Sequence, residues 1–200
     1  SSTRLHDTTA NLASWVCSKS ANHSVTPRSI MPAWLIARDC DDNPIAKYRP
    51  DEWALYKPLN GMKMLELGGK WCSQAGVTYK QVFESLRFHH TSLDWNGEHG
   101  ALVRDLREPQ WPEFGQFNIV SNMGTSEHVG DQRGVWENIH MLTNAGGVYV
   151  GQCPYHDGNS WWWHGEWYPT EEFYQSFATL NGWNIERMYA GGNEPHKNLY

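Results

Sequence analysis

Residues 62–69 read MKMLELGG, a short apolar run with one acidic residue that ends in two glycines. Downstream, Val82, Phe83 and Leu86 recur at the spacing of one helix face. A short apolar run closed by glycines favours a buried strand, and the periodicity after it favours an amphipathic helix. This stretch therefore predicts a strand, a glycine turn and a helix.

The chain repeats this pattern outward from the first strand. Apolar runs bounded by turn residues predict more strands, at residues 88–94, 101–105, 116–122, 148–152 and 183–188. Helical periodicity predicts helices at residues 131–142 and 169–180, the first of them ended by the glycines of 144–147. Strands separated by helices pair in parallel through right-handed crossovers. The expected fold class is α/β, with a doubly wound, mostly parallel, Rossmann-like sheet and helices on both faces.

Residues 1–60 have a different character, without clear alternation of apolar and polar residues. Prolines divide them into short pieces, at Pro27, Pro32, Pro44, Pro50 and Pro58. We predict that residues 1–60 form an N-terminal extension of short helices and loops, packed on a single domain of residues 61–200.

The amino-acid composition argues against two classes of partner, nucleic acids and membranes. The 200 residues carry 16 Lys and Arg against 22 Asp and Glu, a formal charge of -6, which gives no positive field for nucleic acid. The sequence has no apolar run of the ~18 residues that span a bilayer. We therefore expect a cytoplasmic protein without membrane or nucleic-acid partners. Twelve Trp exceed the needs of one small core, so some are expected in a cleft or at a partner surface, including that of a homo-oligomer.

The first strand and its turn resemble a known motif. Residues 65–69, LELGG, resemble the first motif of class I (Rossmann-like) S-adenosylmethionine-dependent methyltransferases, in which an acidic residue and glycines follow an apolar strand. The resemblance implies S-adenosylmethionine as cofactor, bound by Glu66, Gly68 and Gly69. Lys70 and Cys72 stand at the second and third glycine positions of the family pattern. Taken alone, the glycine pair favours an ordinary turn.

Two further acids follow at predicted strand ends. Asp94 closes the second strand, where nucleotide-binding α/β folds place a carboxylate for the ribose hydroxyls. Asp105, followed by Leu106, matches the family position that meets the exocyclic amine of adenine. Taken alone, each acid favours a helix cap or a turn. The order of Glu66, Asp94 and Asp105 at successive strand ends favours one cofactor site on which the three acids converge, together with Leu106.

The fourth strand has the most distinctive motif. Residues 117–129 read FNIVSNMGTSEHV, and this run resembles the strand-four motif of a methyltransferase-like group. The resemblance covers Met62 to Arg187 and implies a class I methyltransferase-like domain over residues 61–200. It adds Asn122 and Gly124 to the expected cofactor-binding residues. In this family the segment after strand four faces the reactive methyl group.

Catalytic residues are expected in that same segment. His128 is the candidate general base, because an imidazole exchanges protons near neutral pH, and Glu127 is expected either to orient it or to bind the acceptor. The alternative is structural, with both residues capping the next helix or holding the loop.

A second aromatic segment lies between the fifth strand and the last helix. Residues 161–168 read WWWHGEWY, and we predict acceptor binding by Trp163, His164, Glu166 and Trp167. A dimer interface or a lid packed on the core is an equal alternative for this segment.

The leading hypothesis is methyl transfer from S-adenosylmethionine to a small-molecule or saccharide-like acceptor. Ten histidines suggest a metal-dependent hydrolase as an alternative, but no H-E-x-x-H or comparable spacing appears, and no metal site is predicted. His89 and His90 are adjacent in a predicted strand and therefore point to opposite faces. A third hypothesis is a non-catalytic binding protein on a degenerate methyltransferase scaffold.

Overall fold

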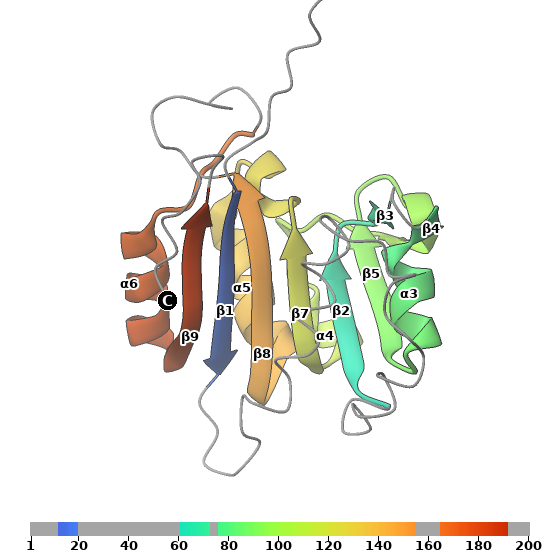
Figure 1. Cartoon of the computed structure of the whole chain (residues 1–200), viewed down its shortest axis with the longest axis horizontal. Helices are drawn as coiled ribbons and strands as arrows, with labels where there is room; N and C mark the ends of the chain where they lie inside the picture. The colour runs from blue at the N-terminus through green and yellow to red at the C-terminus, as the bar shows by residue number, and fades with distance from the viewer. Residues whose placement is uncertain (1–11, 20–60, 73–75, 155–164, 192–200) are drawn as a thin grey trace, which may run out of the picture.

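A computed structural model describes residues 12–19, 61–72, 76–154 and 165–191. Its centre is a seven-stranded sheet in the order β6-β5-β2-β7-β8-β1-β9 (Figure 1). The strands are β1 (Leu12–Lys19), β2 (Lys63–Leu67), β5 (His89–Asp94), β6 (Leu102–Val103), β7 (Phe117–Met123), β8 (Thr143–Pro154) and β9 (Trp183–Gly191). A separate two-stranded ribbon joins β3 (Trp71–Cys72) to β4 (Val77–Thr78). The helices are α3 (Tyr79–Ser85), α4 (Trp111–Phe114), α5 (Gln132–Leu142) and α6 (Glu171–Asn181), with 3-10 turns η4 (Glu98–Gly100) and η5 (Ser126–His128).

The sheet is mixed but mostly parallel, which confirms the predicted α/β class. Strands β6, β5, β2, β7 and β8 pair in parallel. After β2 the chain continues to β5 and β6 on one side, and then to β7 and β8 on the other side. The strand order therefore reverses between β2 and β7, and the carboxyl ends of these two strands meet at one edge of the sheet.

Strand β1 was not predicted. It belongs to the segment 1–60, for which we expected short helices and loops, yet it lies within the sheet and pairs antiparallel with both β8 and β9 (Figure 1). Cys17 and Ser18 are neighbours that point to opposite faces of the sheet, and both are buried, so this strand need not show the alternation of a half-exposed strand. Lys19 at its end donates to the carbonyls of His140 (2.7 Å) and Thr143 (2.9 Å) at the carboxyl end of α5. These bonds satisfy carbonyls that a helix end leaves without intrahelical partners.

The core has two layers, one on each face of the sheet. Neighbouring residues of a strand point to opposite faces, so Met64 packs with α3 whereas Leu65 packs with α5 and α6. In β8, Val148 packs in the layer of α3, and Tyr149 packs in the layer of α5 and α6. On the α5 side, Trp136 is surrounded by aromatic rings of β8, α6 and the segment before α6.

Residues 144–147 differ from the prediction. Helix α5 ends at Leu142 with Thr143 as its C-cap, and β8 begins at once, so the glycines lie inside the strand rather than after the helix. The register between β7 and β8 shifts at this point. A Cβ on Gly147 would collide with the side chains of Asn144 and Thr143 and would lie 3.0 Å from the carbonyl oxygen of Asn118 in β7, so this position has no room for a side chain.

Within the described ranges, no helix has the length and apolar character that would take it across a membrane. Cys17 and Cys153 are both buried, and the Sγ of Cys153 lies 3.8 Å from the hydroxyl oxygen of Tyr174.

Candidate functional site

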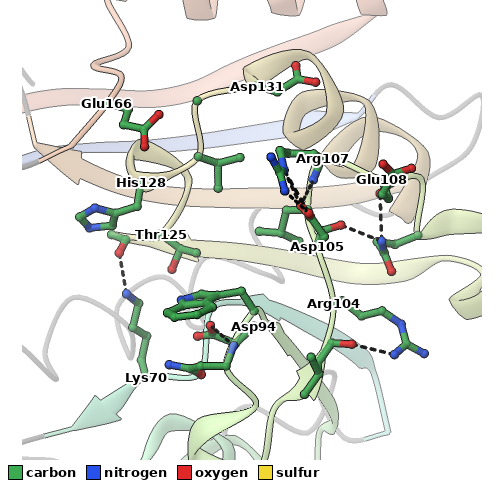
Figure 2. A pocket seen from close by; sticks show the side chains of 18 residues that line it. Lys70, Asp94, Arg104, Asp105, Arg107, Glu108, Thr125, His128, Asp131 and Glu166 are labelled. Atoms are coloured by element: carbon green, nitrogen blue, oxygen red, sulfur yellow. Dashed lines mark hydrogen bonds and ion pairs between the residues drawn. The ribbon is translucent and has the colours of Figure 1, made fainter.

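A cleft of about 1000 Å³ opens at the carboxyl ends of β5, β6 and β7 (Figure 2). This volume lies at the upper end of the range for small-molecule sites, about 300–1,000 Å³. The cleft therefore has room for a ligand of nucleotide size. Its lining residues are Lys70, Asp94, Trp95, Asn96, Val103, Arg104, Asp105, Leu106, Arg107, Glu108, Gln110, Gly124, Thr125, His128, Val129, Gly130, Asp131 and Glu166.

Asp94 is held at the edge of this cleft by the glycine turn. Its Oδ2 accepts a hydrogen bond from the backbone amide of Gly69 (2.7 Å), and its Oδ1 accepts one from the amide of Asn96 (3.3 Å). A carboxylate has about four acceptor positions. Asp94 is thus fixed in place and keeps capacity to accept bonds from ligand hydroxyls.

The two glycines of the turn are explained by close contacts within the protein. Gly68 has a φ of +86°, and a Cβ on it would collide with Oγ1 of Thr125. A Cβ on Gly69 would lie 2.5 Å from the carbonyl oxygen of Glu98. Neither glycine lines the cleft, although the amide of Gly69 orients Asp94.

Asp105 also lines the cleft, but its carboxylate is already paired. Arg107 approaches it with Nη2 at 2.6 Å from Oδ2 and with Nε at 3.0 Å from both oxygens (Figure 2). The hydrogen bonds from Arg107 hold the pKa of Asp105 below its usual value. A ligand amine at Asp105 would therefore share the carboxylate with Arg107.

A buried amide that the sequence analysis missed anchors the segment after Asp105. Asn138 of α5 is 1% exposed; its Oδ1 accepts from the amide of Gln110 (2.7 Å) and its Nδ2 donates to the carbonyl of Leu106 (2.9 Å). Leu106 itself is buried in the core beside the cleft. The sequence does hold a signal for this anchor, because Asn138 is a polar residue on the otherwise apolar helix face of Val135 and Ile139. A polar side chain buried on such a face usually has hydrogen-bond partners.

Glu66 is not brought together with the other two acids. Its side chain is buried, lies outside the cleft lining, and places Oε2 3.2 Å from Nε2 of His90. The ring of His90 stacks on Phe83 of α3 at 5.7 Å between centroids. Burial raises the pKa of Glu66, while His90 and Lys70 partly oppose that rise. Glu66 is therefore a buried residue of β2 and does not line the cleft.

The raised pKa of Glu66 makes a testable difference to stability. Because the folded-state pKa exceeds the unfolded value, this group contributes stability that is fully present below about pH 4.5 and is lost as the pH rises through the folded-state pKa. We expect Glu66→Gln to gain stability relative to the unmodified protein as the pH rises, by at most about 1.4 kcal/mol per pH unit.

Urea unfolding of both proteins between about pH 4.5 and about pH 7.5 measures this difference. Glu137→Gln is the control, because Glu137 is an exposed carboxylate on α5. The stability of this variant relative to the unmodified protein should not change with pH in this way. A stability difference for Glu66→Gln that stays constant across the pH range contradicts the interpretation.

Lys70 crosses from the turn after β2 to the segment after β7. Its Nζ donates to the carbonyl oxygen of Gly124 at 2.5 Å (Figure 2). Its charge acts on Glu66 and Glu127 and lowers the pKa of both carboxyls against the rise caused by burial. In the sequence Lys70 is only a departure from the family motif, whereas in the structure it lines the cleft.

Buried hydrogen bonds shape the segment after β7. Asn122 accepts from the amide of Ser126 (3.0 Å) and donates to the hydroxyls of Ser126 (2.6 Å) and Tyr149 (3.2 Å). Asn122 is therefore a buried support of this segment rather than a lining residue of the cleft.

Glu127 and His128 follow on η5 and face different surroundings. Glu127 is fully buried, and its backbone carbonyl accepts from the amides of Glu166 (2.7 Å) and Trp167 (3.1 Å). His128 lines the cleft, and its Nε2 lies 3.9 Å from Oε1 of Glu127. That separation exceeds a hydrogen bond but is within the range of an ion pair when the imidazole is protonated.

The expected acceptor residues are divided between the cleft and the core. Glu166 lines the cleft, and a Cβ on Gly130 would lie 2.5 Å from its Oε2. Trp167 packs against Phe173, with 4.9 Å between ring centroids, in the core cluster. Trp163 and His164 lie outside the described residues.

The part of the chain that the structure describes holds no group of three or more His, Cys, Asp or Glu side chains able to bind a metal ion. No family model matches the chain, and no curated protein matches it. The function of the cleft is therefore inferred from its own residues.

Proposed function

We propose that the chain is an S-adenosylmethionine-dependent methyltransferase that acts on a small-molecule or saccharide-like acceptor. The observation that carries the proposal is the position of Asp94. This carboxylate ends β5, faces a cleft of nucleotide size and is oriented by the amide of Gly69 in the first turn. Nucleotide-binding α/β folds use a carboxylate in this place for the ribose hydroxyls.

The strand order supports a Rossmann-like, doubly wound interpretation of the sheet. Counting β2, β5, β6, β7, β8 and β9 as first to sixth gives the order 3-2-1-4-5-6, with β1 inserted antiparallel between the fifth and sixth. This is the order of dinucleotide-binding folds, whose ligands lie beyond the carboxyl ends of the strands where the order reverses. Because fold alone does not define function, the proposal rests on the cleft residues.

The residues of the cleft suit the parts of this cofactor. Asp94 would accept hydrogen bonds from the ribose hydroxyls, and Asp105 would accept one from the adenine amine while it stays paired with Arg107. The segment after β7, including Gly124, would lie at the sulfur end. The cofactor supplies the methyl group that is transferred.

His128 is the residue proposed to act on the acceptor. Its side chain is half exposed in the cleft, on the segment that carries Gly124. An imidazole there can take a proton from an acceptor hydroxyl near neutral pH. Glu166, which also lines the cleft, can hydrogen-bond to acceptor hydroxyls and so orient the acceptor.

Calorimetric titration with S-adenosylmethionine and with S-adenosylhomocysteine tests the proposal. We expect both to bind with a stoichiometry of one. Folded protein that binds neither compound would contradict the proposal, and a bound zinc or manganese ion after purification without chelators would favour the hydrolase hypothesis instead.

A further inference from the structure

Two contacts close the space between the turn after β2 and the segment after β7. Lys70 Nζ bonds to the carbonyl of Gly124 at 2.5 Å, and Gly68 packs directly against the side chain of Thr125. These turns follow the two strands between which the strand order reverses. Lys70, Gly124 and Thr125 all line the cleft, so this bridge forms part of its wall.

Charge holds Lys70 in this position. Glu66 and Glu127, which are both buried, each interact electrostatically with Lys70. Arg104 and Arg107, the arginines of the cleft, are already paired with Glu113 and Asp105 at 2.6 Å. The Lys70 ammonium thus has both a carbonyl acceptor and two carboxylates nearby, which favours the bridging position over a solvent-exposed one.

The rest of the cleft is open. Asp94 and Asp105, the residues proposed for the ribose and the adenine, both line it, as does the exposed ring of Trp95. In the proposed function, the segment after β7, which Lys70 holds through Gly124, lies at the sulfur end of the cofactor. A nucleoside can therefore enter without disturbing Lys70, whereas a ligand with the full amino-acid tail meets the Lys70 to Gly124 bridge.

We infer that Lys70 is a specificity-determining residue that keeps the sulfur end of the cleft closed until a complete ligand displaces it from Gly124. This inference rests on the proposed function. A glycine at this position, as in the family pattern, has no side chain to form the bridge. The apparent affinity of a ligand that needs the open form is reduced by the fraction of protein that is open.

The experiment measures dissociation constants for S-adenosylhomocysteine and for adenosine with the unmodified protein and with Lys70→Met. Loss of one hydrogen bond from a charged donor should make S-adenosylhomocysteine bind about tenfold more tightly. Adenosine affinity should not change. Lys70→Gly should behave like Lys70→Met, and Lys70→Arg, which keeps the charge and a donor, should stay close to the unmodified protein.

Removing Lys70 leaves buried carboxylates without its charge, so the single variants could fail to fold. The pair Glu66→Gln and Glu66→Gln/Lys70→Met reduces this problem, since the double variant loses one charge of each sign and leaves only Glu127 without the charge of Lys70. The same gain for S-adenosylhomocysteine, with adenosine unchanged, is expected between these two proteins.

Three results overturn the inference. If S-adenosylhomocysteine binds more weakly without Lys70, the ammonium contacts the ligand rather than excluding it. If both ligands gain equally, or neither changes, the bridge does not select between them. If the unmodified protein binds neither ligand, the proposed function fails together with this inference.

Discussion

Trp136→Ala is expected to lower the free energy of unfolding by about 3–5 kcal/mol, the usual cost of truncating a fully packed aromatic side chain. Trp136 is 5% exposed, and its ring centroid lies 4.9 Å from that of Phe173 and 5.0 Å from that of Phe177. Tyr149 and Tyr174 pack edge-on against it at 5.4 Å. The indole therefore joins α5, β8 and α6, and its removal leaves a cavity that these rigid neighbours cannot fill.

Urea unfolding followed by circular dichroism measures this loss. Trp95→Ala is the matched control, because Trp95 is 80% exposed and surface substitutions change stability by about 0.5 kcal/mol or less. Equal losses for the two variants would show that Trp136 is not the centre of this core layer.

Asp94→Asn is expected to weaken binding of S-adenosylhomocysteine by about tenfold to a hundredfold, since hydrogen bonds to a charged group contribute about 1.5–3 kcal/mol. The amide group keeps the size of the side chain but replaces one acceptor oxygen with a donor. In either orientation the new NH₂ group meets a backbone amide, that of Gly69 or that of Asn96, which bond to Oδ2 (2.7 Å) and Oδ1 (3.3 Å) of Asp94 in the unmodified protein.

Isothermal titration measures the affinity, with Glu137→Gln as the control for the loss of one negative charge outside the cleft. Comparison of adenosine with 2′,3′-dideoxyadenosine locates the contact. The unmodified protein should prefer adenosine, and Asp94→Asn should lose that preference. A variant that binds and discriminates as well as the unmodified protein would remove Asp94 from the ribose site.

The parallel part of the sheet could be predicted because its strands are short apolar runs closed by turn residues. β2, β5 and β7 begin and end within about two residues of the predicted bounds, which is the usual uncertainty of helix and strand ends. Strand β1 could not be predicted in the same way, because its sequence, LASWVCSK, is not an apolar run closed by turn residues. Its adjacent residues Cys17 and Ser18 are both buried, so it lacks the alternation of a half-exposed strand as well.

The cleft could be predicted only in part. Asp94 and Asp105 lie at the carboxyl ends of neighbouring strands, and this rule of parallel sheets brings them to one cleft. Glu66 also ends a strand, but alternation along β2 turns it toward α3 and His90, which a motif match does not reveal. The bridge from Lys70 to Gly124 depends on the position of a long side chain across two turns, so no sequence pattern indicates it.

The central claim is that the cleft at the carboxyl ends of β5, β6 and β7 binds the nucleoside of the cofactor. A crystal structure of the protein with S-adenosylhomocysteine tests it most directly. We predict the ribose hydroxyls within hydrogen-bond distance of the Asp94 carboxylate and the adenine beside Asp105. A ligand bound elsewhere, or a cleft that stays empty at saturating S-adenosylhomocysteine, would contradict this claim.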